Sequence, residues 1–349
     1  MLPLLNDTLP ETWLLPEGPT YRRDQLCQWV FKKKASSFDE MLNLSQPLRQ
    51  HLSEHYSLQG LEMARVQGSR DTTLKYLWKL RKGDFVESVL IPATPDTEGN
   101  RAPRHTLCVS SQVGCAYGCR FCASGLDGWK RNLSSGEIVG QIIKAERQSG
   151  IKINNLVFMG MGEPMANYAN LMQAITMINA PWGLGIGARH ITLSTSGLVP
   201  QILKLAEQPL QLQLAISLHG ASDEVRSQIM PVNKKYPIDA LLGACEQYVS
   251  RKQRMVTLEY ILIENVNDMP KEAMLLASHA KRLGAKVNLI PYNKVDGLDW
   301  SRPSEEVIQT FAQILIKKGV TATVRREKGH DIDAACGQLR LRELKNLEG

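Results

Sequence analysis

Three cysteines stand close together in the segment SSQVGCAYGCRFCASG, which covers Ser110–Gly125. They are Cys115, Cys119 and Cys122, with the spacing Cys-x3-Cys-x2-Cys. Three kinds of site use thiolates at such short spacing. A structural zinc ion takes four closed ligands, and a redox dithiol takes two cysteines. A four-iron cluster that has only three thiolates keeps one iron open for another ligand.

The surroundings of the three cysteines favour the iron–sulfur cluster. No fourth Cys or His follows nearby, and His105 and Cys108 are the only close candidates for a closed zinc site. A dithiol motif would leave Cys115 without a role. The spacing, directly after a predicted strand and before a predicted helix, resembles the radical S-adenosylmethionine (SAM) superfamily. That resemblance implies a [4Fe–4S] cluster on Cys115, Cys119 and Cys122, whose open iron chelates the amino and carboxylate groups of SAM.

The composition is that of an ordinary soluble globular protein. Of the 349 residues, 43% are hydrophobic and 22% are charged. No apolar run is long enough to span a bilayer, and the N-terminus lacks the basic region of a signal peptide. A cytoplasmic location without a membrane partner is therefore expected. The net charge of +7 suits a polyanionic partner without proving one.

The chain has seven cysteines, an odd number that argues against a structural disulfide framework. Cys27 and Cys245 lie in apolar helical patterns, DQLCQWVF and LLGACEQYV, and are predicted to be buried small hydrophobic residues. Taken alone, Cys108 is typical of a core cysteine, and nothing about Cys336 by itself indicates a role.

Residues 1–95 are predicted to form an N-terminal accessory domain. Residues 20–56 have helical apolar spacing that is broken at ASSFDE, which indicates two or three short helices. Residues 72–92 alternate as a β-hairpin does, with its turn at Lys82-Gly83-Asp84. The polar stretch that follows predicts a linker at 96–104. The helices are basic, which is equally compatible with a solvated face and an RNA-docking face; the residues are Arg22, Arg23, Lys32, Lys33 and Lys34.

After residue 100, predicted strands alternate with amphipathic helices. Strands are predicted at 105–110, 155–159, 190–194, 211–218, 256–263, 286–290 and 321–325, and helices at 135–147, 168–178, 238–249, 271–283 and 304–317. Ser134, with Glu137 three residues later, predicts a capping box. Such βα units imply a parallel sheet. The expected fold is an α/β protein: a partial (β/α)6-type TIM barrel over residues 105–335, with a small N-terminal helical and β-hairpin domain and a C-terminal segment at 336–349.

In a β/α barrel, functional groups gather at the carboxyl ends of the strands. Those ends are polar or glycine-rich here, and the residues are Gly160, Gly162, Glu163, Ser194, Ser217, His219 and Asn293. The glycines permit close approach of the backbone to a ligand, and Glu163 is suited to the amino group of a methionine. Each residue alone is also compatible with a turn or a buried polar group. Four such strand ends around one barrel mouth indicate a binding site.

Longer motifs carry a more specific resemblance. CVSSQVGCAYGCRFCASG, FMGMGEPMAN, LSTSGLVP, ISLHGASDEVR, MPVNKKYPI, VNLIPYN and DIDAACGQLR together resemble the radical SAM RNA methyltransferases that methylate an adenosine carbon. The resemblance covers nearly the whole chain. It is greatest to the bacterial dual-specificity type, which makes 2-methyladenosine in 23S ribosomal RNA and, next to the anticodon, in tRNA. It implies an enzyme that transfers one-carbon groups and whose N-terminal domain recognises RNA.

The resemblance also implies a covalent mechanism, because the adenine carbon is electron-poor and a poor nucleophile. In the family, one SAM methylates a cysteine by displacement, and Cys336 corresponds to it. A second SAM, cleaved at the cluster, gives a 5′-deoxyadenosyl radical that takes hydrogen from the methylcysteine, and the resulting carbon radical adds to adenine. Glu87 corresponds to the proton acceptor. Cys108 corresponds to the resolving thiol, which forms a transient disulfide with Cys336 and frees the product.

The family resemblance extends to the ligands. The residues implied to bind SAM are Gly162, Glu163, Ser194, Ser217, Leu218, His219 and Asn293. The target adenosine must leave its stack to reach a buried site, and a basic run near the C-terminus is suited to phosphates or forms a solvated charge run; its residues are Arg325, Arg326 and Lys328. Further expectations are an electron donor such as flavodoxin and a monomeric state.

Two other functions stay open from the sequence. A carbon-8 methyltransferase of the antibiotic-resistance type would share the mechanism. Pro164 in GMGEP favours the carbon-2 type, because the carbon-8 type tends to have alanine there, although one residue beside SAM need not set regiochemistry. The distant alternative is a non-enzymatic RNA-binding protein stabilised by a metal site. It predicts zinc without iron, and little effect of replacing Cys336 by alanine.

Overall fold

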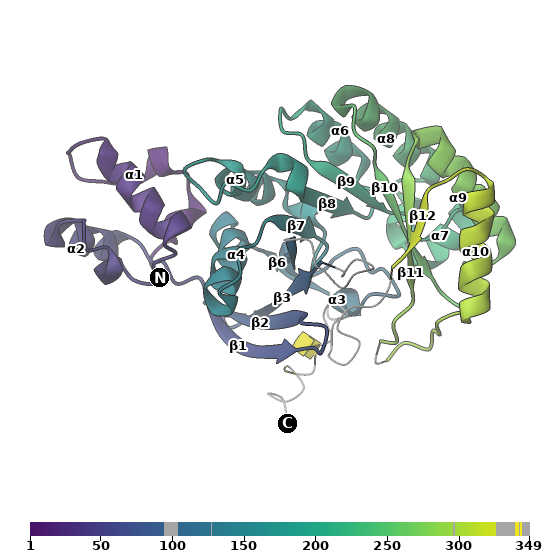
Figure 1. The fold of residues 1–349 in the computed structure, drawn as a ribbon, viewed down its shortest axis with the longest axis horizontal. Helices are drawn as coiled ribbons and strands as arrows, with labels where there is room; N and C mark the ends of the chain where they lie inside the picture. The colour runs from purple at the N-terminus through teal and green to yellow at the C-terminus, as the bar shows by residue number, and fades with distance from the viewer. Residues whose placement is uncertain (94–103, 127, 296, 326–338, 342, 344–349) are drawn as a thin grey trace, which may run out of the picture.

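One sheet organises the part of the chain that the structure describes. The computed structural model describes residues 1–93, 104–126, 128–295, 297–325, 339–341 and 343. The strand order is β1-β2-β3-β4-β7-β8-β9-β10-β11-β12 (Figure 1). The strands are β1 Leu61–Gly68, β2 Leu74–Leu80, β3 Phe85–Pro92, β4 His105–Cys108, β7 Asn155–Phe158, β8 Ile191–Thr195, β9 Gln213–Ser217, β10 Thr257–Leu262, β11 Lys286–Pro291 and β12 Ala322–Val324.

From β4 onward the sheet is parallel. β4 pairs with β7, β7 with β8, and so on through β12. Every strand that the alternating pattern predicts after residue 100 is present, with ends within about two residues of those expected. β1 and β12 are the two edges of this sheet, so it forms an open barrel. The expected partial β/α barrel is confirmed.

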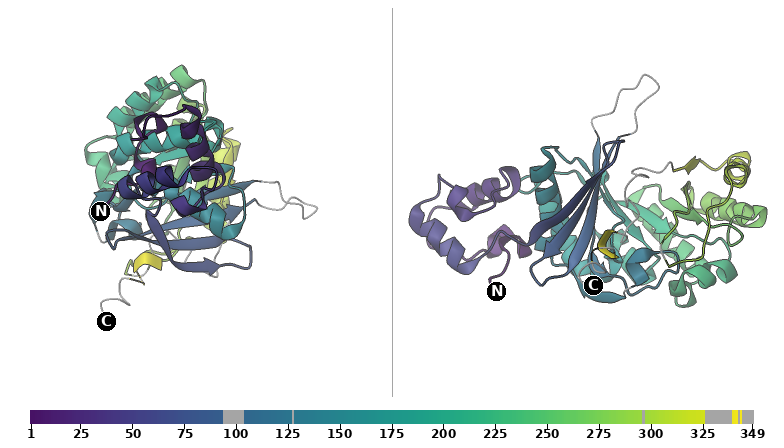
Figure 2. Two further views of the ribbon diagram at one scale, coloured as in Figure 1. Left: turned by 90° about the vertical axis from the view of Figure 1, so that its left-hand side faces the viewer. Right: turned by 90° about the horizontal axis from the view of Figure 1, so that it is seen from below.

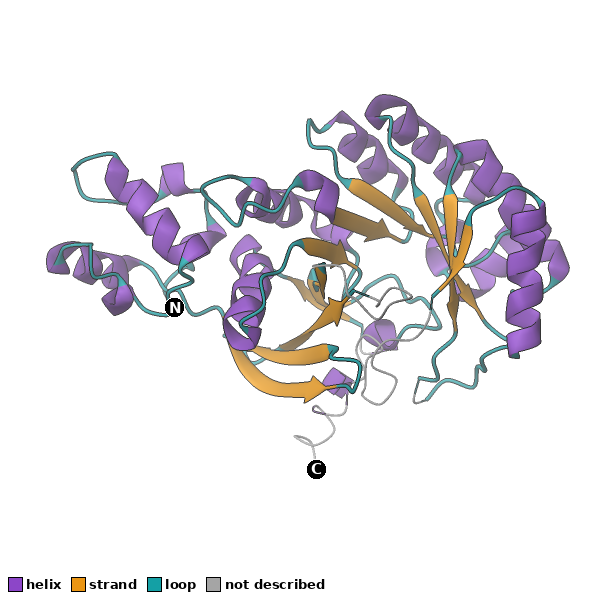
Figure 3. Ribbon diagram, in the orientation of Figure 1, coloured by secondary structure: helices purple, strands orange, loops and turns teal. Residues whose placement is uncertain are grey.

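Helices cover the outer side of the parallel strands (Figure 3). They are α4 Ser135–Ser149, α5 Tyr168–Asn179, α6 Val199–Glu207, α7 Asp223–Ile229, α8 Ile238–Lys252, α9 Pro270–Leu283 and α10 Glu305–Lys317. The short α3, Ala123–Leu126, follows Cys122 directly and lies against β5, Gln112–Gly114. The five predicted helices are confirmed. So is the capping box, since Ser134 Oγ accepts from Glu137 N at 3.1 Å and Glu137 Oε2 accepts from Ser134 N at 3.0 Å. The pattern does not predict α6 and α7, because nine and seven residues give the apolar period too few turns to stand out.

The antiparallel strands β1–β3 extend the barrel sheet. β3 pairs with β4, and the hairpin turn is confirmed: Gly83 has φ +88°, and its N–H donates to Leu80 O at 2.9 Å. α1 Tyr21–Cys27 and α2 Gln46–His55 lie at one end of the molecule, away from α9 and α10 (Figures 1 and 2). The domain boundary at residue 95 stays a prediction. Most of the predicted linker and the boundary at 336 lie outside the described residues.

The core lies between the sheet and the helices. On α10 the residues Ile308, Phe311 and Leu315 are buried at helical spacing and face β12 and α9. Cys27 and Cys245 are buried as predicted, and burial raises the pKa of each thiol to about 12. Among the described residues, no helix combines the length and the apolar character needed to cross a membrane.

Candidate active site

A pocket of about 240 Å³ opens where the parallel strands end, as expected for a β/α barrel. Of the residues that the sequence analysis proposed, those lining it are Cys115, Cys119, Cys122, Gly160, Gly162, Glu163, Ser194, Ser217 and His219. Leu218 is fully buried and is not one of the lining residues, and neither is the half-buried Asn293. The fold therefore brings the cysteines together with most of the proposed SAM-binding residues.

The three cysteines lie on one loop that a short antiparallel hairpin closes. β5, Gln112–Gly114, pairs with β6, Trp129–Asn132, and Cys115 N donates to Gly128 O at 3.0 Å. Gly114 has φ +73°, and a Cβ atom there would lie 1.8 Å from Gly128 O, so only glycine fits. The hairpin holds the ends of the loop together, and inside the loop Cys122 N donates to Cys119 O at 3.1 Å.

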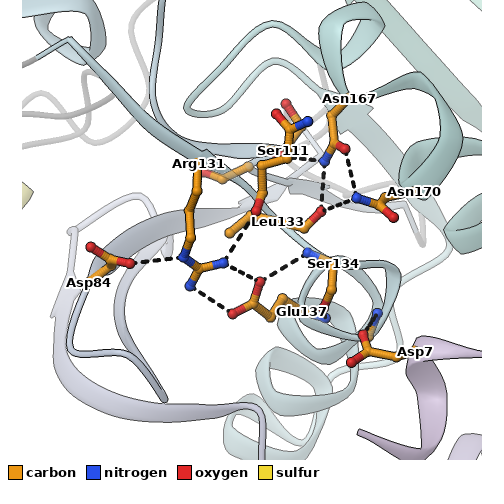
Figure 4. Close-up of polar contacts among 12 residues, drawn as sticks. Asp7, Asp84, Ser111, Arg131, Leu133, Ser134, Glu137, Asn167 and Asn170 are labelled. Atoms are coloured by element: carbon orange, nitrogen blue, oxygen red, sulfur yellow. Dashed lines mark hydrogen bonds and ion pairs between the residues drawn. The ribbon is translucent and has the colours of Figure 1, made fainter. Parts of the chain in front are cut away.

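A polar network fixes this hairpin to the barrel (Figure 4). Arg131 on β6 donates to Asp84 at 2.9 Å and forms a fork with Glu137 at 2.8 and 2.9 Å. Asn167, after β7, donates to Leu133 O at 2.7 Å. Because these partners come from the β2–β3 turn, from α4 and from the loop after β7, the cysteine loop is anchored at three places.

The three cysteine side chains share the pocket. Cys115, Cys119 and Cys122 all line it, and a four-iron cluster binds each of its thiolates through a different iron. Burial raises the pKa of Cys115 to about 12 and that of Cys119 well above its usual value. Both thiols therefore need a positively charged partner in order to ionise.

Glu163 lies at the start of the loop after β7 and is fully buried. Its Oε2 accepts from the N and Oγ atoms of Ser196 at 2.7 and 2.8 Å, and its Oε1 accepts from Met165 N at 3.0 Å. Burial raises the pKa of this carboxyl, against the opposing effect of these donors. Oε1 keeps a lone pair for a donor in the pocket, such as an ammonium group.

Gly160 and Gly162 are required by the packing of the protein itself. A Cβ atom on Gly160 would lie 2.8 Å from the carbonyl of Val109, and one on Gly162, where φ is +96°, would lie 2.5 Å from Gln112 Cβ. The two glycines allow the loop after β7 to pack against the segment that leads to the cysteines. Both glycines still line the pocket.

Ser194, Ser217 and His219 follow the ends of β8 and β9. The two serine Oγ atoms are 3.3 Å apart. His219 Nδ1 accepts the backbone N–H of Ile261 at 3.0 Å, which places the proton of the neutral ring on Nε2. Burial, assisted by the charge of Arg226, lowers the pKa of His219 to about 3. The imidazole is therefore neutral at pH 7.

Arg226 on α7 is a site residue that the sequence reading missed. Its guanidinium donates to Ser196 O at 2.6 Å, Leu218 O at 3.0 Å and Asn233 Oδ1 at 2.7 Å. It thus ties the end of β8 to the end of β9 from behind the pocket. Burial lowers its pKa to about 10. Nothing in the sequence distinguishes it from an exposed helical arginine, because only the packing of α7 buries it.

Glu259 on β10 was also missed. It stands in register between Ser217 on β9 and Asn288 on β11, and it lines the pocket. Its Oε2 accepts from Asn288 Nδ2 at 2.7 Å, whereas its Oε1 has no hydrogen-bond partner among the described residues. Burial raises its pKa, and Asn288 and Arg325 oppose that effect. Arg325 lines the same pocket, while Arg326 and Lys328 lie outside the described residues.

Glu87 and Cys108 lie on neighbouring strands and face the same side of the sheet. Cys108 pairs with Val89 across β3 and β4, and Glu87 is two residues from Val89, so the two side chains are diagonal neighbours at about 7–8 Å. The opposite face carries Ser88, whose hydroxyl donates to Gln141 of α4 at 2.8 Å. Glu87 is 3% exposed. Glu87 is therefore buried and does not face the solvent.

Both carboxylate oxygens of Glu87 are engaged. Oε1 accepts from Arg340 N at 2.7 Å, and Oε2 lies 3.0 Å from Lys75 Nζ. Leu339 packs against apolar residues of β2 and β3, so this short piece of the C-terminal segment lies on the strand pair that carries Glu87 (yellow in Figure 1). Cys336 precedes Arg340 by four residues and lies outside the described residues.

Similarity to known proteins identifies the family of this chain. Residues 109–277 match the Radical SAM superfamily, and residues 16–58 match the Ribosomal RNA large subunit methyltransferase N-terminal domain. A probable dual-specificity RNA methyltransferase RlmN of Akkermansia muciniphila is 53% identical over 352 residues, which cover 100% of this chain and 98% of that relative. The chain belongs to the RlmN family. An RlmN relative from Opitutus terrae is 51% identical over 95% of this chain and 91% of its own length.

The fold agrees with the family. The crystal structure of a radical SAM methyltransferase from Sphaerobacter thermophilus matches with a TM-score of 0.90 at 42% identity, covering 96% of this chain and 98% of that one. As a member of the RlmN family, the protein is a radical SAM RNA methyltransferase that uses a [4Fe–4S] cluster and SAM. The enzyme class expected from the sequence is confirmed, which removes the non-enzymatic alternative.

Proposed function

We propose that the protein methylates carbon 2 of one adenosine in 23S ribosomal RNA and of the adenosine next to the anticodon in tRNA, with two molecules of SAM per turnover. The observation that carries the proposal is the position of Glu87. It lies beside Cys108, and it accepts a hydrogen bond from Arg340 N, four residues after Cys336. Glu87 and Cys108 thus lie on neighbouring strands, and Arg340, four positions after Cys336 in the sequence, contacts Glu87 directly.

Cys115, Cys119 and Cys122 are proposed to hold the cluster. SAM would lie in the same pocket, against Gly162, Glu163, Ser194, Ser217, Leu218, His219 and Asn293. When bound, the cluster and SAM supply a methyl group and a carbon-centred radical. Glu163 offers a carboxylate to the ammonium group, and the paired serine hydroxyls offer further polar contacts. Asn293 does not line the pocket, but its buried Oδ1 has no hydrogen-bond partner among the described residues and is open to a donor.

Cys336 is the proposed carrier of the methyl group to the base. Radical addition leaves a methylene bridge between Cys336 sulfur and the adenine carbon together with one unpaired electron on the ring, which the cluster would be suited to accept. Glu87 takes the proton from that carbon, and the electron pair of the broken carbon–hydrogen bond returns to the ring. Cys108 then attacks Cys336 sulfur: the sulfur–carbon bond breaks, a disulfide forms, and the released carbon takes up a proton to become the methyl group. The two thiols are oxidised, and their two electrons reduce the bridge.

The short segment between Cys336 and Arg340 allows Cys336 to reach Glu87. Arg340 follows Cys336 by four positions in the sequence. A fully extended chain rises by at most about 3.6 Å per residue, so the Cα atoms of these two residues are no more than about 14 Å apart. Because Arg340 N bonds to Glu87 directly, Cys336 has the reach to meet both Glu87 and Cys108.

RNA binding is proposed for the basic N-terminal helices, with one exception. Lys34 pairs with the buried Glu146 at 2.7 Å and so belongs to the internal structure. Lys32 and Lys33 are exposed and suit phosphate contacts. Arg325 lies in the pocket itself, where it fits a phosphate of an adenosine that has left its stack.

Mass spectrometry of digested RNA tests the proposal. The anaerobically reconstituted protein is given SAM, a reductant and either an unmodified 23S fragment or tRNA. We expect 2-methyladenosine in both RNAs. 8-Methyladenosine in the ribosomal fragment would retain the mechanism and overturn the carbon-2 assignment. No methylated adenosine, despite an intact cluster and cleaved SAM, would overturn the proposed substrate.

Cysteine variants test the covalent route. Cys336→Ala should bind SAM and RNA but give no product, whereas Cys108→Ala should accumulate a covalent protein–RNA adduct visible on a denaturing gel. Cys27→Ala is the matched control, because this buried thiol lies in α1 and should leave turnover unchanged. Full turnover by Cys336→Ala would contradict the proposed carrier, and a Cys108→Ala protein without adduct would remove Cys108 from the resolving role.

A further inference from the structure

Lys75 and Glu87 form an ion pair that is almost completely buried. Lys75 Nζ lies 3.0 Å from Glu87 Oε2, with side-chain exposures of 0% and 3%. Lys75 is on β2, where it pairs with Val89, and Val89 pairs in turn with Cys108 on β4. Lys75, Val89 and Cys108 therefore form one row across three strands. Glu87 lies diagonal to both ends of that row.

Stability alone does not account for this pair. Two charges must lose their hydration in order to be buried, and apolar residues of similar volume often stabilise such a position as well or better. Apolar residues are accommodated on the same face of these strands, since Leu77, which pairs with Glu87, and Phe85, two residues before Glu87, pack with Leu339. A lysine and a glutamate at Lys75 and Glu87 therefore point to chemistry rather than to folding.

Both oxygens of the Glu87 side chain are held in place. Lys75 lies against Oε2, and Arg340 N donates to Oε1. A group that is to remove a proton from carbon must keep one orientation relative to that carbon.

We propose that Lys75 is a positioning residue for the release step: through the buried ion pair it holds the Glu87 side chain in one orientation, aimed at the carbon whose proton Glu87 removes. The inference rests on the proposed function of Glu87. In the step, the carbon–hydrogen bond of the bridged adenine breaks and an oxygen–hydrogen bond forms on Glu87. Lys75 neither gives nor takes a proton. It acts before the step, through the orientation of the Glu87 side chain.

The test separates the release step from the earlier steps of turnover. Lys75→Met removes the charge and keeps the length of the side chain, Lys75→Arg restores a charge, and Lys152→Met is a control at a lysine that is 61% exposed. Methylation of Cys336 is measured by mass spectrometry, and the covalent adduct is measured on denaturing gels. We expect Lys75→Met to methylate Cys336 normally, to accumulate the adduct and to lose product formation at least about 10-fold. Lys75→Arg should recover part of it, and Lys152→Met should match the parent.

Glu87→Gln, measured in parallel, separates this inference from the proposed function. If Glu87→Gln shows no adduct, the role of Glu87 fails. If it shows the adduct whereas Lys75→Met releases product at the parent rate, only the inference fails. Adding Lys75→Met to Glu87→Gln leaves a neutral pair that avoids an unpaired buried charge, so the comparison holds even where Lys75→Met alone does not fold. The inference expects no further change in the double variant, and an additional loss of release would overturn it.

Discussion

Arg226 offers the sharpest test of how the pocket is built. The Arg226→Met variant keeps much of the side-chain volume but removes the guanidinium that donates to Ser196 O and Leu218 O. Ser196 O and the buried Asn233 Oδ1 then lose their donor, at about 1–3 kcal/mol each, whereas Leu218 O still accepts from Gly220 N at 2.8 Å. The free energy of unfolding should therefore fall by roughly 2–6 kcal/mol, out of the 5–15 kcal/mol that is typical of a domain.

The Arg226→Met variant should also bind SAM more weakly. Ser196 supplies two of the donors that hold Glu163, and Leu218 lies between Ser217 and His219 in the wall of the pocket. Once Arg226 no longer ties these strand ends, we expect SAM affinity to fall by about 10-fold or more, because groups displaced by as little as 1 Å lose much of their effect. Arg226→Lys keeps a charge but not the planar fork, so it should recover only part of the loss.

Two measurements decide the outcome. Urea unfolding gives the change in stability, and calorimetric titration of the anaerobically reconstituted protein gives the affinity for SAM. Arg251→Met is the matched control: Arg251 pairs with Glu207 at 2.9 Å on the exposed surface, so its loss should cost less than about 1 kcal/mol. An Arg226→Met protein with the stability and SAM affinity of the parent would refute the reasoning.

Three further predictions follow from the pocket. Gly162→Ala should lower the free energy of unfolding by about 2–4 kcal/mol in urea titrations, because φ is +96° and the added Cβ would lie 2.5 Å from Gln112; unchanged stability would contradict this packing. The pKa of His219 is lowered from 6.5 to about 3, so between these pH values the unfolded state binds a proton that the folded ring does not. The free energy of unfolding should therefore fall as pH drops from 6.5 towards 3, by on the order of 5 kcal/mol. In urea unfolding series at several pH values His219→Gln should flatten this pH dependence, and an unchanged dependence would contradict the prediction. Glu259→Gln should weaken SAM binding about 10-fold in calorimetry, since Oε1 of the carboxylate is open to a donor in the pocket; undiminished affinity would show that SAM does not use it.

The cysteine motif and the barrel could be predicted because their information is local. The three cysteine positions lie within one loop, and the strand and helix periods repeat within each βα unit, so neighbouring residues suffice to recognise them. The capping box at Ser134 and Glu137 is predictable for the same reason. The short helices α6 and α7 were missed because their few turns gain stability from packing rather than from pattern.

By itself, the sequence determined the cluster motif, the alternation of strands and helices, and the family that these residues resemble. Only the tertiary structure decided that Glu87 is buried, that Lys75 pairs with it, and that Arg340, 253 residues away in the sequence, donates to it. Strand register and long-range backbone hydrogen bonds set these contacts, and neither leaves a periodic signal in the sequence. A carboxylate on an alternating strand is typical of a solvated face until the sheet and the C-terminal segment that bury it are in place.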